Sequence, residues 1–236
     1  MPLSFPSLTA MRRSAVALIA VVASATAIPA PASAEPPTPT IVDTARGAGN
    51  VVSFTFDDGP NPPDTLRLLQ VLRRHQVRAV FCLWGDHVRQ YPEVVRRIAA
   101  DGHVLCNHSM RHDDLTTKTA EEIRTDLLDT NAAIREAVPY ASIPYFRAPY
   151  GAWGESPQIA AELRMQPLGW RMDIADWEPP GANALVQRLR DRITPGAVVL
   201  MHDGGGDRSQ TVQAVNRIIP ELRGQQYRFT LPERRG

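Results

Sequence analysis

Adjacent carboxylates and closely spaced histidines are the residues of this chain whose types and spacing suit catalysis. Asp57 and Asp58 lie next to each other, ahead of a Gly-Pro pair. Because side chains alternate along a strand, one carboxylate can bind a metal while its neighbour handles a proton. The same four residues also suit an ordinary turn, so the pair alone leaves both interpretations open.

His108 and His112 are four residues apart and follow an apolar segment. A helical turn at this point would place both imidazoles on one face, at the spacing that divalent metals use. Two solvated histidines in the polar loop around Asp113 are the alternative. With Asp58, the histidines form a set of two nitrogens and one carboxylate, which leaves coordination positions open for water and substrate, as in catalytic sites.

Further groups can support proton transfer. Arg147 is a permanent cation that would hold a nearby acid ionised, although a surface salt bridge fits its position equally well. Asp173 and Asp176 precede Trp177, an aromatic that suits either the core or the wall of a ligand cleft. His202 ends an apolar run and, beside a carboxylate, can donate a proton. The remaining histidines lack such neighbours and are predicted to lie on the surface: His75, His87 and His103.

The elements that position these residues alternate between apolar runs and amphipathic segments, which is typical of a parallel α/β domain. Helices are predicted around the shared faces of 68–72 and 94–98, from 156, and at 210–222. Each reactive residue then follows the carboxyl end of a strand, the face where parallel barrels assemble their sites. Seven strands are predicted, at 51–56, 79–83, 103–106, 145–147, 166–170, 197–201 and 227–231.

The chain has 236 residues, of which 43% are apolar and 22% charged, so a single domain is expected. Residues 1–34 have the features of a signal peptide: Arg12-Arg13, an apolar run, and a small-residue cleavage pattern ending at Ala34. The apolar run is short for a membrane span, so we expect secretion without stable membrane insertion, with an uncleaved anchor as the alternative. Either Met1 or Met11 can be the start.

The segment at 35–49 is Pro-rich and predicts a spacer ahead of a catalytic domain at 50–232. The domain is close to neutral, so nucleic-acid binding is not expected. Cys82 and Cys106 are the two cysteines of the chain. Export makes a disulfide feasible, but two buried thiols suit their apolar segments equally well.

Five short motifs follow one another along the chain: T-F-D-D-G-P at 55–60, H-S-M-R-H at 108–112, R-A-P-Y-G at 147–151, D-I-A-D-W at 173–177 and L-M-H at 200–202. Together and in this order they resemble the polysaccharide deacetylase family, the NodB-homology domain of carbohydrate esterase family 4. The resemblance covers about residues 50–232. Ala148 is a departure, because proline is common at that position in the family.

The resemblance implies a fold and a metal site. The fold would be a distorted (β/α)7 barrel of the α/β class. The metal would be divalent, zinc or another transition metal such as cobalt, and its ligands would be Asp58, His108 and His112.

The resemblance also implies roles in the reaction. Asp57 would be the general base, oriented by Arg147, and His202 the general acid, tuned by Asp176. The backbone N–H of Tyr150 would stabilise the oxyanion. The remaining implied residues would wall the acetyl pocket: Trp177 and Leu200. Asp173 receives no role.

The implied activity is metal-dependent removal of acetyl groups from N-acetylglucosamine polymers such as peptidoglycan or chitin oligomers, by a monomer that releases acetate. An O-acetyl esterase acting on xylan is an alternative, because the same residues would attack the same acetyl carbon. A non-catalytic sugar-binding protein is a second alternative. It would lack a ligand, the base or the acid, whereas every one of these residues is present here.

Overall fold

The computed structural model describes residues 1–4 and 39–235, and its sheet is built around strand β1 (Val51–Gly59). All nine residues of β1 are buried. The strand pairs in parallel with β2, β7 and β8. The other strands are β2 (Val80–Leu83), β3 (Val104–Asn107), β4 (Tyr145–Phe146), β5 (Gln166–Pro167), β6 (Met172–Asp173), β7 (Ala197–His202) and β8 (Arg228–Phe229).

Seven strands follow one another in the order β5-β4-β3-β2-β1-β7-β6, and β8 joins the sheet beside β1. The predicted distorted barrel of the α/β class is therefore confirmed. One prediction was wrong in detail: a single strand was expected at 166–170, whereas the chain forms β5 at one edge of the sheet and β6 at the other. Strands of two residues are too short to show an alternating pattern in the sequence.

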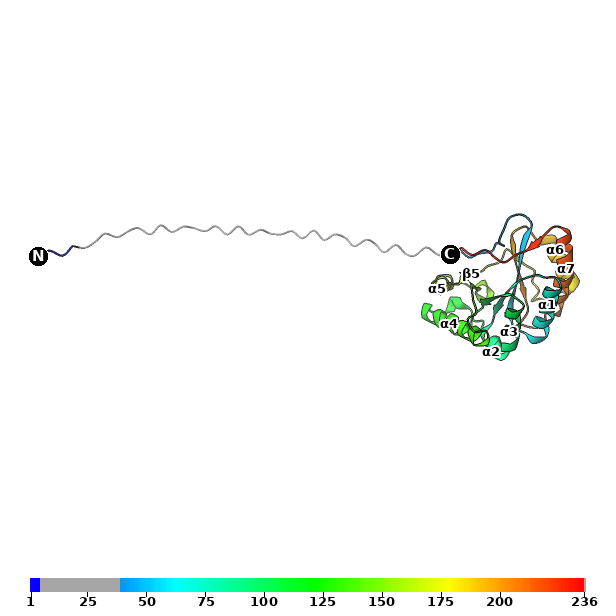
Figure 1. The fold of residues 1–236 in the computed structure, drawn as a ribbon, viewed down its shortest axis with the longest axis horizontal. Helices are drawn as coiled ribbons and strands as arrows, with labels where there is room; N and C mark the ends of the chain where they lie inside the picture. The colour runs from blue at the N-terminus through cyan, green and yellow to red at the C-terminus, as the bar shows by residue number, and fades with distance from the viewer. Residues whose placement is uncertain (5–38, 236) are drawn as a thin grey trace. The chain divides into compact units, whose positions relative to one another are not determined.

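The helices surround the strands, and Figure 1 shows α1, α6 and α7 on one side with α2 to α5 on the other. Helix α1 buries Leu68, Val71 and Leu72 against the sheet, as predicted. Helix α3 ends just before Gly102, whose left-handed backbone suits a residue beyond a helix end. The helices are α1 (Pro62–Arg74), α2 (Gly85–Gln90), α3 (Pro92–Ala100), α4 (Ala120–Ala137), α5 (Ser156–Glu162), α6 (Ala182–Arg192), α7 (Ser209–Gly224) and the short 3-10 turns η1 (Leu115–Thr117) and η2 (Pro149–Gly151).

Described residues that precede the predicted start of the domain at 50 also pack into it. Val42 and Ala45, which the sequence assigns to the spacer, are buried. Val42 bridges Leu168 beyond β5, and Thr44 bridges Ala197 at the start of β7. This segment covers strand ends that would otherwise present unpaired backbone groups. Most of the predicted signal peptide, at 5–34, lies outside the described residues, as does 35–38. None of the described helices is long and apolar enough to cross a membrane.

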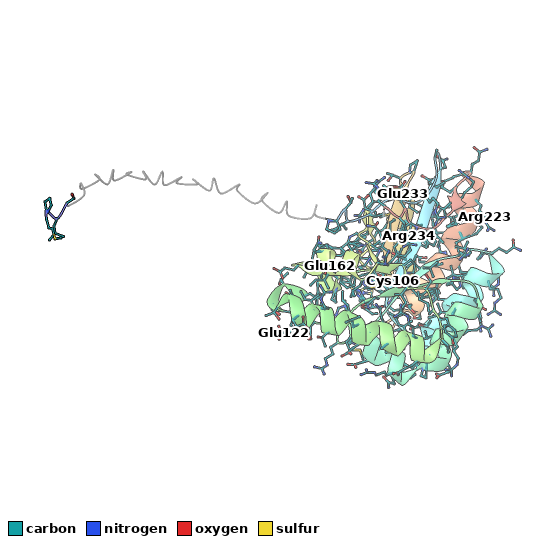
Figure 2. All side chains as sticks on the ribbon, turned by 60° about the vertical axis from the view of Figure 1, so that its left-hand side comes forward. Cys106, Glu122, Glu162, Arg223, Glu233 and Arg234 are labelled. Atoms are coloured by element: carbon teal, nitrogen blue, oxygen red, sulfur yellow. A yellow bond between two sulfur atoms is a disulfide. The ribbon has the colours of Figure 1, made fainter. Side chains whose placement is uncertain are left out.

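Cys82 and Cys106 form a disulfide between β2 and β3. The two residues face each other in register on neighbouring strands, and both are fully buried. Figure 2 shows Cys106 well inside the domain. The strand register therefore decides between the two interpretations that the sequence left open.

Replacing both cysteines by alanine is expected to lower the free energy of unfolding by about 3 kcal/mol, because a bridge across this sequence separation restricts the unfolded chain. The bridge spans 24 residues. Urea unfolding of the oxidised protein and the double variant measures the difference. Equal unfolding midpoints would show that the bridge contributes nothing to stability.

Candidate active site

The turn at the end of β1 presents both carboxylates to the same face of the barrel. Asp57 pairs in register with His202 of β7, so these two residues are neighbours although 145 positions separate them. Asp58 has a left-handed backbone with φ of 70°. The turn therefore ends the strand and brings both acids into the space above the sheet.

Arg147 holds Asp57 in a fixed position. Its guanidinium donates to Asp57 Oδ1 at 2.7 Å and to the Thr55 hydroxyl at 2.9 Å. It also donates to the backbone oxygens of Leu168 and Gly169. Arg147 is 0% exposed, so the surface salt bridge is excluded. These charge-assisted bonds fix the position of the Asp57 carboxylate.

Asp58, His108 and His112 meet at one point. Asp58 Oδ1 lies 3.4 Å from His108 Nε2 and 3.1 Å from His112 Nε2. One ligand atom from each residue lies within 4.8 Å of the others. No donor in the described part of the chain satisfies Asp58 Oδ1, which is buried. This point therefore attracts positive charge.

The tautomer of His108 suits a metal ligand. Its Nδ1 donates to the backbone oxygen of Arg147 at 2.8 Å, which directs the Nε2 lone pair at Asp58 when the ring is neutral. Burial lowers the pKa of His108, but Asp57 and Asp58 outweigh burial, so the pKa is raised overall. Two imidazole nitrogens and one carboxylate, whose buried Oδ1 has no hydrogen-bond donor among the described residues, fit a divalent transition metal.

The loop from His108 to His112 is not the helical turn that the spacing left open as one way to bring the two imidazoles together. Ser109 and His112 have left-handed backbones, and the segment is a bend. The N–H of Ser109 donates to Asn107 Oδ1, and the N–H of His112 donates to Ser109 Oγ. Such bonds from side chain to backbone compete with helix formation, so the segment forms a bend instead of a helical turn. The bend still brings both imidazoles to Asp58.

His202 and Asp176 form a second pair. His202 Nδ1 lies 2.7 Å from Asp176 Oδ1, and the His202 N–H donates to Asp176 Oδ2. The Thr211 hydroxyl also donates to Asp176. Burial lowers the pKa of His202, but the hydrogen bond and the charge of Asp176, together with the charges of Asp57 and Asp58, raise it to about 9. This histidine is therefore suited to carry a proton at neutral pH.

Arg208 is a supporting residue that the sequence did not indicate. It is buried, and its guanidinium donates to the backbone oxygens of Gly204, Gly205 and Asp176. Its backbone N–H donates to Asp64. Arg208 thus ties the loop after His202 to the segment that carries Asp176. No sequence motif identifies Arg208, because its guanidinium binds main-chain oxygens.

One cleft of about 470 Å³ is lined by Asp57, Asp58, His108, His112 and His202. Its volume is in the range of about 300 to 1,000 Å³ typical of small-molecule sites. Tyr150 and Trp177 are 73% and 54% exposed at its wall, so Trp177 does not belong to the core. Ala148 lines the same wall with φ of −73°, a value that proline also adopts. The other lining residues are Gly151, Trp170, Asp173 and Leu200.

None of the three histidines predicted to lie on the surface is fully exposed. His103 is buried beneath β2 and β3, and burial lowers its pKa to about 4. His75 and His87 are half-buried. His87 contacts the turn at Asp58, and no sequence signal distinguished it from an exposed helix residue.

Two carboxylates and three histidines that converge at the carboxyl end of a parallel barrel are a group suited to hydrolytic chemistry. Comparison with known proteins gives the family of the chain. The sequence model of the polysaccharide deacetylases matches residues 44–168. The chain belongs to the polysaccharide deacetylase family, as the five motifs indicated, and it is a hydrolase with deacetylase activity.

The relatives agree in fold and in sequence. A chitooligosaccharide deacetylase of Rhizobium leguminosarum bv. trifolii is 40% identical over 194 residues, which cover 76% of this chain and 89% of the relative. A peptidoglycan-N-acetylglucosamine deacetylase of Bacillus cereus is 35% identical over 182 residues, with 76% and 84% covered. A crystal structure of a peptidoglycan N-acetylglucosamine deacetylase in complex with an N-oxidanyl-benzamide aligns with a TM-score of 0.75 at 31% identity, covering 81% of this chain and 89% of that chain.

Proposed function

We propose that this protein is an exported, metal-dependent deacetylase of N-acetylglucosamine polymers. The proposal rests on one observation: Asp57, His202 and the group formed by Asp58, His108 and His112 all line the same cleft. The relatives named for chitooligosaccharides and for peptidoglycan support an N-acetylated sugar as the substrate.

The proposed metal ligands are Asp58, His108 and His112. A divalent ion, zinc or cobalt in our proposal, would polarise the acetyl carbonyl and increase the acidity of water. Its charge also complements the orphaned Asp58 Oδ1.

In the proposed reaction, Asp57 takes one proton from water and His202 gives one proton to the sugar nitrogen. Asp57, positioned by Arg147, takes a proton from the water that attacks the acetyl carbon. The backbone N–H of Tyr150 donates to the carbonyl oxygen as negative charge develops there. The carbon–nitrogen bond then breaks, and His202 protonates the departing sugar nitrogen, which yields a free amine and acetate.

The walls of the cleft suit a sugar ring with an acetyl group. Trp177 is an exposed aromatic on which a sugar can pack, and Leu200 offers an apolar contact for the acetyl methyl. An intact base, acid and ligand set also separates this chain from a sugar-binding protein that has lost its site.

The decisive experiment measures acetate release from chitin oligomers, peptidoglycan and acetylated xylan by protein stripped with a chelator and resupplied with zinc or cobalt. We expect release from an N-acetylated polymer that disappears on stripping and returns with metal. Release from xylan alone would replace the proposal by an O-acetyl esterase. Undiminished release after complete stripping would overturn the metal dependence.

Export is a second part of the proposal. The signal-peptide features of residues 1–34 and the Cys82–Cys106 disulfide both support it, because disulfides persist in oxidising compartments. Sequencing of the mature N-terminus should give Glu35. A mature protein that keeps its apolar run would favour the anchored form.

The pH dependence of the rate should report His202. A general acid must be protonated, so the rate should fall on the alkaline side as pH rises through the raised pKa of His202, which is about 9 before a bound cation lowers it. The Asp176→Asn variant removes the carboxylate that raises this pKa most, so its alkaline limb should move toward the ordinary histidine pKa of about 6.5. Profiles of kcat/KM against pH test this, and an unmoved limb would contradict the assignment.

A further inference from the structure

His87 lies in α2 and contacts the turn that carries Asp58. Its Nδ1 is 2.9 Å from the Asp58 backbone oxygen. A carbonyl oxygen accepts hydrogen bonds and cannot donate them, so Nδ1 carries the hydrogen. His87 is therefore a fixed donor to the main chain of a proposed metal ligand.

The other hydrogen bonds to main-chain oxygens of this turn come from backbone donors. The oxygen of Asp57 accepts from the N–H groups of Asp203 and Gly204, and the oxygen of Gly59 accepts from the N–H of Trp84. Among the described residues, His87 is the side chain that donates to a main-chain oxygen of 57–59. A substitution of His87 can therefore remove one support of the turn and leave the others in place.

The backbone at Asp58 needs such support. Its φ of 70° is a left-handed conformation that costs energy for any residue with a side chain, and it persists where the surroundings hold it. On the opposite side of this carbonyl, a Cβ at Gly204 would lie 2.0 Å from the Asp58 oxygen, so the space is filled by the Gly204 backbone. This conformation directs Asp58 Oδ1 at the two ligand imidazoles.

The ring of His87 also contacts the proposed metal centre through Trp84. The two rings stack with centroids 4.2 Å apart. Trp84 packs against His112 at 5.2 Å, and Tyr150 packs edge-on against His112 at 4.5 Å. The imidazole of His112 is therefore held between two aromatic rings, one of which rests on His87.

We propose that His87 is a positioning residue for the metal centre. Its hydrogen bond to the Asp58 oxygen holds this peptide in the left-handed conformation. This inference rests on the proposed function, because it needs a metal at Asp58, His108 and His112. Loss of a partner that orients a ligand typically lowers metal affinity about 10- to 100-fold.

The test compares three variants of the full chain by metal affinity, measured by competition of stripped protein with a chromogenic chelator for Zn²⁺ or Co²⁺. His87→Phe keeps a ring on Trp84 and loses the donor. His87→Asn keeps an N–H donor near the Nδ1 position and loses most of the ring. His87→Ala loses both. We expect the metal affinity to fall about 10- to 100-fold in the Phe and Ala variants and to be largely retained in the Asn variant.

A purely structural role would give a different pattern. The unfolding temperature of the stripped variants would then fall with the amount of ring that is lost, and metal affinity would not change. His75→Ala is the matched control, because it removes a half-buried imidazole that bonds Asn216 away from the site. Its metal affinity should equal that of the wild type.

The outcomes separate this inference from the proposed function. If the wild type binds metal and releases acetate while the Phe variant binds metal as tightly as the wild type, the role of His87 is overturned and the proposed function stands. If the wild type binds no metal, the proposed function fails and this inference fails with it. If the Ala variant does not fold, the Asn variant provides the test. A loss of metal affinity in the Asn variant, which retains the donor, would also overturn the role of His87.

Discussion

Replacing Asp57 with asparagine is expected to lower kcat by about 10²- to 10⁴-fold, the usual contribution of a positioned acid or base. Asparagine has the same shape and can still accept a hydrogen bond from Arg147, which donates to Oδ1 at 2.7 Å. Its amide cannot take a proton from water. The metal affinity should therefore be close to that of the wild type, because Asp57 is not one of the three clustered ligands.

Stability must be measured beside activity in this variant. The neutral amide leaves the buried charge of Arg147 without its counter-ion, so the free energy of unfolding should fall by about 1 to 3 kcal/mol. The control is Asp86→Asn, which removes an exposed carboxylate of α2 near the site. It should change neither stability nor kcat. A rate close to the wild type in Asp57→Asn would show that another group is the base.

Replacing His108 with alanine is expected to remove both metal binding and activity. His108 is buried, its Nε2 faces Asp58, and its Nδ1 is fixed by the Arg147 oxygen. Loss of an orienting partner costs about 10- to 100-fold in affinity, so loss of a ligand should cost more than about 100-fold. Chelator competition measures the affinity, and acetate release at saturating metal measures the activity.

The two substitutions both lower activity but differ in their effect on metal binding. Asp57→Asn should keep the metal and lose turnover, whereas His108→Ala should lose both. Added zinc should restore little activity to His108→Ala, because burial and the fixed loop leave no flexible side chain to replace the imidazole. Wild-type metal affinity in His108→Ala would contradict the ligand assignment, even if activity were lost.

The sequence was sufficient for the fold class and for the residues of the cleft. Reactive residues such as Asp57, His108 and His202 follow apolar runs, and parallel strands bring their carboxyl ends to one face. This rule alone predicts that residues far apart in the chain share a site. The order of the five motifs added the family, which the comparisons confirm.

The tertiary structure decided what depends on contacts between distant backbone segments. The register of β2 and β3 brings Cys82 to Cys106, and apolar patterning does not fix register between strands that are buried on both faces. Bonds from Asn107 and Ser109 to the backbone give the bend at the histidines, where spacing alone left a helical turn open.

The supports of the site were also decided by the tertiary structure. His87 donates to the backbone oxygen of Asp58 and Arg208 to that of Asp176, both remote in sequence, so neither a motif nor a hydrophobic period identifies them. Sequence patterns report which side chains face the core and which residues end a strand. The residues that hold a turn or a loop in place become visible once the chain has folded around them, because their partners are main-chain atoms that every residue possesses.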